Sequence, residues 1–394
     1  MLAKKRSAPL GLLALVVTSA LAFTACSSSA PGEAAPTDDN SGGSAPEGVR
    51  TAQERVEAAL AIPEFGLADA PKVDASAAAG SKIAVIPISS ENPYATDIVA
   101  SMEKIAKEYS VELDVFANQG QPNQWANGID QAINNKVDAV MLLAGADPKL
   151  VVPQITRARE AGIEVIVTHL YQAGEEPPAE VRDLISGYTT APFNEAASLL
   201  ADYAIAKGDG NTRILYITSD EVGPAVGQKN SFLAESKELC PGCTVDVVNV
   251  PLTDWATKLS SETQSYLVAN PDTEWVIPIY DSMAPNVIAG INQANRATDV
   301  KVASFNGTPA ILQLIQEGTP MAADLGESVD WLGYSAMDCV FRVLATGTGL
   351  PGGDDKMPLR IFDSSNVDDT GTPPKAGLGY GDAYIEGYQT LWAG

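Results

Sequence analysis

Between residues 82 and 325, short apolar runs alternate regularly with segments of helical periodicity. After the first run, apolar residues recur every three or four positions at Ile98, Met102, Ile105 and Tyr109, as on one face of a helix. Near-continuous apolar strands separated by helices are typical of parallel sheets that helices cover on both faces. We therefore predict an α/β fold. The predicted strands are residues 82–88, 111–117, 137–144, 163–169, 212–218, 243–250, 274–280, 300–306 and 321–325.

The segments that follow these runs are polar, contain Gly and Pro, and carry several aromatic residues. Ligands of open parallel sheets bind beyond the carboxyl ends of the strands, so these segments are the first place to look for a site. Loops with a purely structural role have less reason to offer so many amides, hydroxyls and rings together. The segments are SENPY, HLY, SDEVGPAVGQKN, DSMAPN and NGTP.

The start of the chain has the pattern of an export signal. Lys4, Lys5 and Arg6 precede an apolar run over 10–23, which is too short to cross a bilayer comfortably. The FTAC sequence that ends at Cys26 resembles the lipobox of bacterial lipoproteins, and this resemblance implies a signal peptide over 1–25 and a lipid on Cys26. The alternative is a plain signal peptide that contains an incidental cysteine.

A segment of small and acidic residues follows this cysteine. Residues 26–48 lack apolar side chains that could repay the entropy of ordering, so we predict a disordered tether. Residues 49–80 then read as an amphipathic helix and a lead-in to the first strand. Together these segments predict an extracytoplasmic body held by a lipid anchor at the outer face of a bacterial cell membrane.

Charge and cysteine content narrow the range of partners. The chain has 25 basic and 50 acidic residues and a net charge of −25, which argues against nucleic acid as a partner. Cys240 and Cys243 lie in a CPGC turn and have no second ligand pair for a structural zinc ion. For an exported protein we predict a local disulfide between them, and we expect Cys339 to be a buried free thiol.

Enzymatic functions find little support in the sequence. His169 is the only histidine, which limits acid–base and triad chemistry, and the chain has no histidine-rich metal motif. The GTGLPG stretch at 347–352 contains a proline and opens no βαβ unit, so it is no dinucleotide site. We expect neither a cofactor nor a metal. A DNA-reading helix-turn-helix would have to precede Lys82, where the sequence shows a signal, a tether and one helix.

Four stretches of the chain resemble a known family. They are KIAVIPISSENPYATDIVASMEKIAKEY, DAVMLLAGADPKLVVPQITRAREAGIEVIVTH, VIPIYDSMAPNVIAGINQAN and DVKVASFNGTPAILQLIQEG. Their sequences and order resemble the type I periplasmic substrate-binding proteins of sugar-uptake ABC transporters, in the ribose-binding-like group. The resemblance covers residues 81 to about 347. It implies two Rossmann-like lobes, each a parallel sheet flanked by helices, joined by a three-segment hinge.

The resemblance also implies where the lobes begin and end. The N-terminal lobe would comprise 81–186 and 328–355, and the C-terminal lobe with the tail would comprise 187–327 and 356–394. The lobes would close on a small molecule at the hinge and present it to an ABC permease. We expect such a protein to act as a monomer.

Carrying over the ligand contacts of the family gives nine candidate residues. Tyr94 and Trp255 could sandwich the apolar face of a ring-shaped ligand. His169 and Leu170 replace an aspartate–arginine pair that fixes adjacent sugar hydroxyls in the family, so a polyol or modified sugar becomes a better candidate than ribose or galactose. The candidates are Asn92, Tyr94, His169, Lys229, Trp255, Tyr280, Asp281, Asn306 and Glu327.

Most of these residues also have a structural interpretation. His169 could be a structural core residue, and Trp255 could pack within its lobe. Tyr94 could begin the apolar stripe of its helix, and Asp281 could cap the helix that follows it. Asn306 before a glycine fits a turn. Lys229 and Glu327 could both be solvated. The sequence leaves all these alternatives open.

Two other functions remain open at this point. The same fold could serve as a sensory module that presents an autoinducer or an aromatic signal to a membrane receptor. A surface enzyme is the second alternative, and it would require turnover of a bound ligand. The sequence favours capture of a sugar or sugar-like molecule for an ABC permease, without catalysis.

Overall fold

The computed structural model describes residues 46–394. The predicted signal peptide, Cys26 and most of the predicted tether lie outside the described residues. Helix α1 (Glu47–Leu60) begins within the last residues assigned to that tether. Over residues 46–394, no helix combines the length and the apolarity that crossing a bilayer requires.

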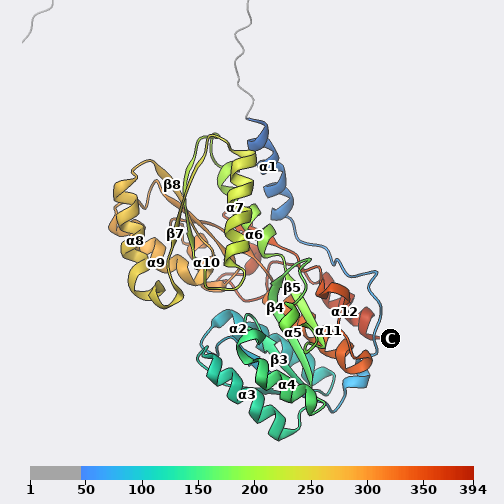
Figure 1. The fold of residues 1–394 in the computed structure, drawn as a ribbon. Coiled ribbons are helices and arrows are strands. Elements are labelled where there is room, and N and C mark those ends of the chain that lie inside the picture. Colours follow the sequence, from blue (N-terminus) through green and yellow to red (C-terminus); the bar gives the residue numbers. More distant parts are fainter. Residues whose placement is uncertain (1–45) are drawn as a thin grey trace, which may run out of the picture. The chain divides into compact units, whose positions relative to one another are not determined.

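The first lobe is built on a parallel sheet with the strand order β2-β1-β3-β4-β5. Figure 1 shows β3, β4 and β5 of this sheet with helices of the same lobe around them. Its strands are β1 (Lys82–Pro87), β2 (Glu112–Val115), β3 (Ala139–Leu143), β4 (Glu164–Gln172) and β5 (Gly187–Ala191). Its helices are α2 (Pro93–Glu108), α3 (Pro122–Asn135), α4 (Val152–Glu160), α5 (Ala179–Arg182) and α11 (Val329–Thr346), with the short helices η1 (Ala75–Ala78) and η2 (Pro148–Val151).

The second lobe has a sheet with the order β11-β10-β9-β8-β6-β7, in which only β11 runs antiparallel among the described strands. Its strands are β6 (Arg213–Thr218), β7 (Thr244–Asn249), β8 (Thr273–Pro278), β9 (Lys301–Asn306), β10 (Met321–Gly326) and β11 (Arg360–Asp363). Its helices are α6 (Phe193–Ala206), α7 (Ala225–Leu239), α8 (Trp255–Ala269), α9 (Ala284–Gln293) and α10 (Pro309–Gln316), with the short helices η3 (Leu252–Asp254) and η4 (Asp281–Met283).

Helices on both faces of the sheets explain the continuous apolar strands. In β1, Ile83 and Val85 belong to the apolar cluster that includes residues of α2 and α11. The alternate residues Ala84 and Ile86 belong to a second cluster, on the side of α3 and α4. Because successive strand side chains point to opposite faces, a strand covered on both faces must be apolar at every position.

The structure confirms the predicted fold class and each of the nine predicted strands, and it adds two more. β5 has the sequence GYTTA, which combines a glycine, two threonines and an alanine with a single tyrosine. Such a segment contains no apolar run, so the sequence did not predict this strand. β11 is only four residues long and lies in the turn-rich tail. β4 also continues past its predicted end at residue 169 to Gln172.

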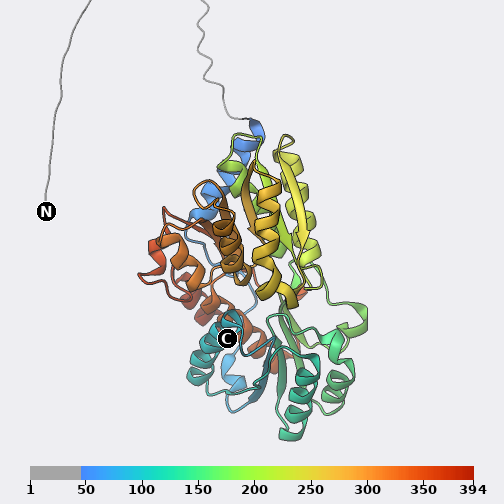
Figure 2. The same cartoon turned by 90° about the vertical axis from the view of Figure 1, so that its left-hand side faces the viewer.

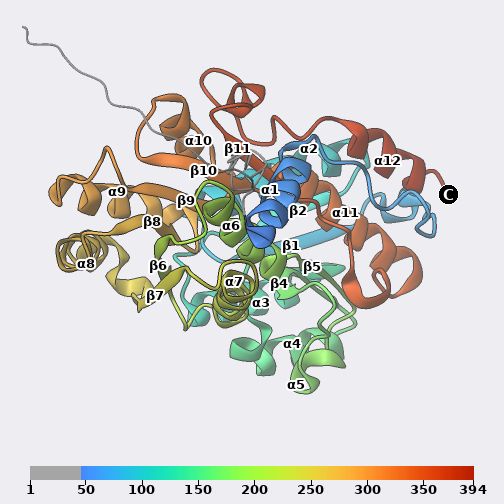
Figure 3. The ribbon, with the colours of Figure 1, turned by 90° about the horizontal axis from the view of Figure 1, so that it is seen from above.

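Helix α1 packs on the second lobe. It contacts α6 and α7 (Figure 3). Its buried residues are Val49, Ala52 and Val56. A Cβ atom at Gly48 would lie 1.9 Å from the carbonyl oxygen of Leu239, so the first turn of α1 approaches the end of α7 more closely than any other residue type permits. The chain then runs over residues 61–74 to η1, which packs on α11 of the first lobe.

The tail after α11 contacts both lobes. It forms η5 (Pro351–Gly353), pairs β11 with β10, forms η6 (Val367–Thr370) against α10, and ends in α12 (Ala383–Trp392) on α11. The Trp392 ring stacks on Tyr334 at 5.5 Å between centroids, which fixes α12 to the first lobe. Figures 1 and 2 show the C-terminal end of the chain at the level of this lobe. The lobe boundaries proposed from the sequence stay a prediction.

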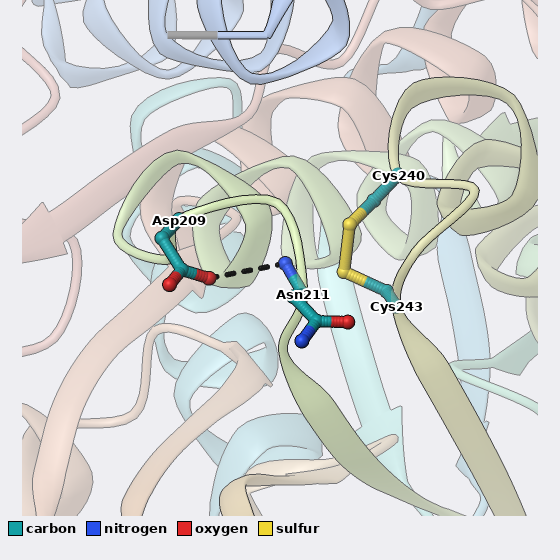
Figure 4. The surroundings of a disulfide bond; sticks show 4 residues. All are labelled: Asp209, Asn211, Cys240 and Cys243. Carbon is teal, nitrogen blue, oxygen red and sulfur yellow. Dashed lines mark hydrogen bonds between the residues drawn. A yellow bond between two sulfur atoms is a disulfide. The ribbon is translucent and has the colours of Figure 1, made fainter. Parts of the chain in front are cut away.

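A short cross-link closes the turn between α7 and β7. Cys240 and Cys243 form a disulfide, and the turn lies beside the loop in which the Asn211 amide donates to Asp209 Oδ1 at 3.1 Å (Figure 4). A Cβ atom at Gly242 would lie 2.6 Å from the Gly210 carbonyl oxygen, so the turn and this loop are in close contact. Cys339 is a buried free thiol.

We predict that Cys240→Ser with Cys243→Ser lowers the free energy of unfolding by about 2 kcal/mol, since the cross-link limits the unfolded chain even across a four-residue loop. Urea denaturation measures this change. A reducing agent should shift the wild-type midpoint towards that of the double variant and leave the variant unchanged. Equal midpoints for the two proteins under oxidising conditions would contradict the prediction.

Candidate functional site

An irregularity in β4 places the histidine. Pairing with β5 holds at Val167 and Tyr188 and resumes at Tyr171 and Thr190, so the strand bulges between these pairs. His169 lies in this bulge with a φ of +53°, a left-handed conformation that few non-glycine residues adopt. The bulge therefore sets the direction of the imidazole, in the way such features often orient a side chain beside a functional site.

Three buried polar side chains meet at one carboxylate oxygen. Tyr94 comes from the first turn of α2, His169 from β4, and Glu327 from the residue after β10. The Tyr94 hydroxyl donates to Glu327 Oε2 at 3.0 Å, and His169 Nε2 lies 2.8 Å from the same oxygen. Each of the three residues is less than a tenth exposed. These residues, called here the hinge cluster, link the first lobe to the end of a second-lobe strand.

Aromatic rings surround the imidazole of the hinge cluster. The Tyr94 ring lies 5.5 Å from the His169 ring, and Phe193 meets the imidazole edge-on at 5.1 Å. Phe193 also packs edge-to-face with Phe305 at 6.4 Å. The arrangement combines ring faces with polar groups, which suits a ligand that has both an apolar face and hydroxyls.

The charge of the hinge cluster follows from its burial. Burial by itself lowers the pKa of His169, but the Glu327 carboxylate beside it reverses this effect and raises the pKa above its ordinary value. Burial and Glu327 also raise the pKa of the Tyr94 hydroxyl well above its usual range, so Tyr94 remains a donor. Nearby Asp355 accepts from the Ser335 hydroxyl, and burial raises its pKa to about 7.

Two buried carboxyl groups, those of Asp281 and Asp324, lie at the carboxyl ends of β8 to β10. Asp281 Oδ1 accepts from the Ser304 hydroxyl at 2.6 Å, and Oδ2 accepts from the Thr308 amide and hydroxyl at 2.8 and 2.7 Å. Burial, followed by the charge of Asp281, raises the pKa of Asp324 well above its usual range. A protonated Asp324 can therefore donate to its neighbour, and Asp281 supports the β9 loop.

Three other candidates gather in the second lobe around the turn after β6. Lys229 pairs with Asp220 at 2.6 Å. Trp255 Nε1 donates to the Ser219 hydroxyl at 3.1 Å, so this ring is held at the same turn. The Tyr280 hydroxyl donates at 2.9 Å to the side-chain oxygen of Gln228, the neighbour of Lys229. These contacts hold all three side chains within their own lobe.

The two asparagine candidates differ in their roles. Asn92 caps α2, where its side-chain oxygen accepts from the Ala95 amide at 3.3 Å. Asn306 ends β9 half-buried, and within residues 46–394 its side chain makes no hydrogen bond. Its amide is therefore free to pair with a ligand, whereas the side chain of Asn92 is already used.

Several residues of the site were missed in the sequence. The chain passes between the lobes after β5, after β10 and after η5. Phe193 follows β5 and Asp355 follows η5, and no apolar run marks either position. Asp324 had a signal, since it is an acid near the end of a buried strand in MAADL. Tyr380 is 2% exposed and comes from the turn-rich tail, where the sequence offered no periodicity.

Buried polar atoms without a partner mark where the site is incomplete. Within the described residues, Glu327 Oε1, Asp324 Oδ2 and Tyr380 Oη are buried and make no hydrogen bond. Such groups are rare in proteins because each carries a desolvation cost that a partner normally offsets. The arrangement can supply the Glu327 Oε1 acceptor and the Tyr380 hydroxyl to a polar ligand.

Metal chemistry has no evident location in this part of the chain. Residues 46–394 contain no group of three His, Cys, Asp or Glu side chains that is arranged to hold a metal ion.

Hollows of about 270 and 600 Å³ open on the first lobe, beside Tyr188 and beside Ile163 respectively, and neither is lined by a candidate residue. The hinge cluster and its neighbours remain the candidate site.

We predict that the stabilisation contributed by His169 falls as the pH rises above about 6.5, the usual pKa of an unfolded histidine. The folded protein holds the imidazole in its charged form, so this contribution is complete below that pH and is lost as the pH passes the raised folded pKa. The melting temperatures of the wild type and His169→Gln, compared from pH 5.5 to 9, measure it.

Asp355 titrates in the same range, so the comparison is repeated with Asp355→Asn in both proteins. The difference in melting temperature between proteins with and without His169 should still depend on pH when both carry Asp355→Asn. This pH dependence should disappear when Glu327→Gln removes the charge that holds the proton. A difference between wild type and His169→Gln that is constant with pH would contradict the prediction.

Comparison with known protein sequences shows similarity over most of the chain. The family described as "Periplasmic binding protein domain" matches residues 83–348. A ribose import binding protein of Salmonella typhimurium is 24% identical over 273 residues, which is 69% of this chain and 88% of that protein. A D-ribose/D-allose-binding protein of Pseudomonas aeruginosa is 21% identical over 251 residues, 61% of this chain and 75% of that protein.

Solved structures show the same fold. An ABC transporter solute-binding protein of Bacillus halodurans with bound myo-inositol matches with a TM-score of 0.64 and 17% identity. The match covers 75% of this chain and 99% of that one. This chain therefore contains nearly the whole of that fold and has additional residues outside it.

Proposed function

Because this chain belongs to the periplasmic binding protein family, whose sequence model spans residues 83–348, we propose that it captures a sugar or polyol between its lobes and delivers it to an ABC permease. Its relatives are named as a ribose import binding protein and a D-ribose/D-allose-binding protein, and the chain is a binding protein and not an enzyme. The relatives and the solved structure described above are named as sugar-binding or transport components, which favours transport over sensing.

The observation that carries the proposed ligand class is the hinge cluster with its unpartnered oxygen. Glu327 Oε2 is occupied by Tyr94 and His169, and Oε1 is buried without a partner. A ligand hydroxyl that donates to Oε1 would form a charge-assisted hydrogen bond and remove the cost of that buried acceptor. Polyhydroxylated molecules offer several such donors.

The remaining candidates support the same ligand class in different ways. We assign direct contact to the hinge cluster and to Asn306, whose amide is free. Trp255, Tyr280 and Lys229 would line the second-lobe side. Asn92 and Asp281 would act through the segments that they hold, because hydrogen bonds within the protein already occupy their side chains.

Calorimetric titration of the purified full chain with D-ribose, D-allose and myo-inositol tests the proposal. We predict binding of at least one of them, and a loss of about 10- to 100-fold in affinity for Glu327→Gln, which removes a charged acceptor. Glu317→Gln is a matched control, since Glu317 is exposed at the end of α10 and its change should leave the affinity intact.

The ligand class has a clear opposing outcome. Binding of nucleosides or small aromatic compounds, with no binding of sugars or polyols, would retain a solute-binding role and overturn the sugar assignment. At a concentration about 100 times Kd, a true ligand should also add about 2.7 kcal/mol to the free energy of unfolding, which thermal unfolding detects independently.

We also propose that Cys26 carries a lipid. The proposal is supported by the basic cluster, the apolar run and the FTAC sequence at the start of the chain, together with the extracytoplasmic location of the family. The small and acidic residues that follow would act as a tether between the membrane and α1.

We predict that Cys26→Ser releases the protein from the membrane fraction and abolishes its metabolic labelling with a fatty acid, because the lipid attachment atom is lost. Cell fractionation and labelling measure both effects. Cys339→Ser is the control, since Cys339 is buried and should not affect either result. Continued labelling of Cys26→Ser would exclude this cysteine as the lipid site.

A further inference from the structure

The tail brings one residue to the candidate site from outside the matched family region. The family match ends at residue 348, and the following residues form β11 on the free edge of β10. β10 is the strand that leads directly into Glu327. The tail is therefore attached to one of the elements that build the site, and it returns there at Tyr380.

The position of Tyr380 is held by its neighbours. Arg360 in β11 donates to the carbonyl oxygen of Gly379, and it also donates to the Leu60 carbonyl oxygen at 3.0 Å and to Asp369 at 2.7 Å. The ring of Phe362, two residues further along β11, meets the Tyr380 ring edge-on at 5.2 Å. Tyr380 is thus held in two ways, through the backbone of the preceding Gly379 and through contact of its own ring with Phe362.

The Tyr380 hydroxyl lies against two glycines at the ends of β9 and β10. A Cβ atom would lie 2.0 Å from this hydroxyl at Gly326 and 2.5 Å from it at Gly307. Only glycine at both positions leaves space for the hydroxyl. These glycines adjoin Asn306 and Glu327, so the tyrosine reaches the backbone that carries both proposed ligand contacts.

The hydroxyl is buried and unpartnered beside other unpartnered groups. Within the described residues, Tyr380 Oη, Glu327 Oε1 and Asp324 Oδ2 make no hydrogen bond. Burial raises the pKa of Tyr380 well above its usual range, and the acidic side chains around it act in the same direction. The phenol therefore keeps its proton at physiological pH and has a hydrogen bond to donate.

We propose that Tyr380 is a specificity-determining residue whose hydroxyl donates a hydrogen bond to an oxygen of the bound sugar or polyol, next to the contacts of Asn306 and Glu327. The inference rests on the proposed function and deepens it, because it assigns part of the ligand site to the tail. It also gives a partner to a tyrosine hydroxyl that is buried and makes no hydrogen bond within residues 46–394.

Tyr380→Phe removes only the hydroxyl, and calorimetric titration of the full chain with D-ribose, D-allose and myo-inositol measures the effect. We expect about tenfold weaker binding of each sugar or polyol that the wild type binds. Tyr388→Phe is a matched control, since Tyr388 is also a buried tyrosine of the tail with an unpartnered hydroxyl, but it lies on α12. Its affinity should equal that of the wild type.

Monodeoxy derivatives of the bound sugar or polyol provide a second measurement that does not depend on the stability of a variant. One derivative should bind the wild type and Tyr380→Phe equally, because it lacks the oxygen that the hydroxyl contacts. The other derivatives should still be bound more weakly by the variant.

Each other outcome overturns the inference in a recognisable way. If the wild type binds a probe and Tyr380→Phe binds it with the same affinity, the inference fails and the proposed function stands. Equal weakening by Tyr380→Phe and Tyr388→Phe would show a structural effect of the tail and no ligand contact. If none of the three probes binds the wild type, the inference falls together with the proposed ligand class.

Discussion

A single buried carboxylate joins parts of the chain that are far apart in sequence. Glu327 accepts from Tyr94 and lies beside His169, and these three residues come from α2, β4 and the end of β10. A buried carboxylate is costly unless it is paired, so the elements that carry its partners must hold their positions to within a fraction of an ångström. The bulge in β4 and the cap of α2 meet this requirement locally.

This constraint connects the fold to its proposed role. Parallel strands end at a common edge of each sheet, so α/β connections bring polar loops together without requiring a dedicated scaffold. Glu327 also lies where the chain passes from β10 to α11, one of the crossings between the lobes. A ligand that binds to this residue is therefore in contact with the segment about which the lobes would move.

The alternation of strands and helices was readable in the sequence because strands buried on both faces are apolar at every position. β5 was not predicted because its sequence, GYTTA, contains no run of apolar residues. The loops after the strands were correctly identified as polar, but their side-chain partners were not predictable. Tyr94 and Glu327 lie 233 positions apart, and only the three-dimensional path of the chain decides whether such residues meet. Tyr380 had neither a periodic pattern nor a family position to mark it.

The folding unit is longer than the family region. Helix α1 precedes residues 83–348, and β11 and α12 follow them. Helix α1 covers apolar residues of α6, β11 pairs with the edge of β10, and α12 covers α11 with its buried rings. A protein trimmed to residues 83–348 would expose these faces and leave β10 as an unpaired edge strand, a template for intermolecular pairing. We therefore expect the isolated family region to self-associate through this edge, whereas in the longer chain β11 covers it.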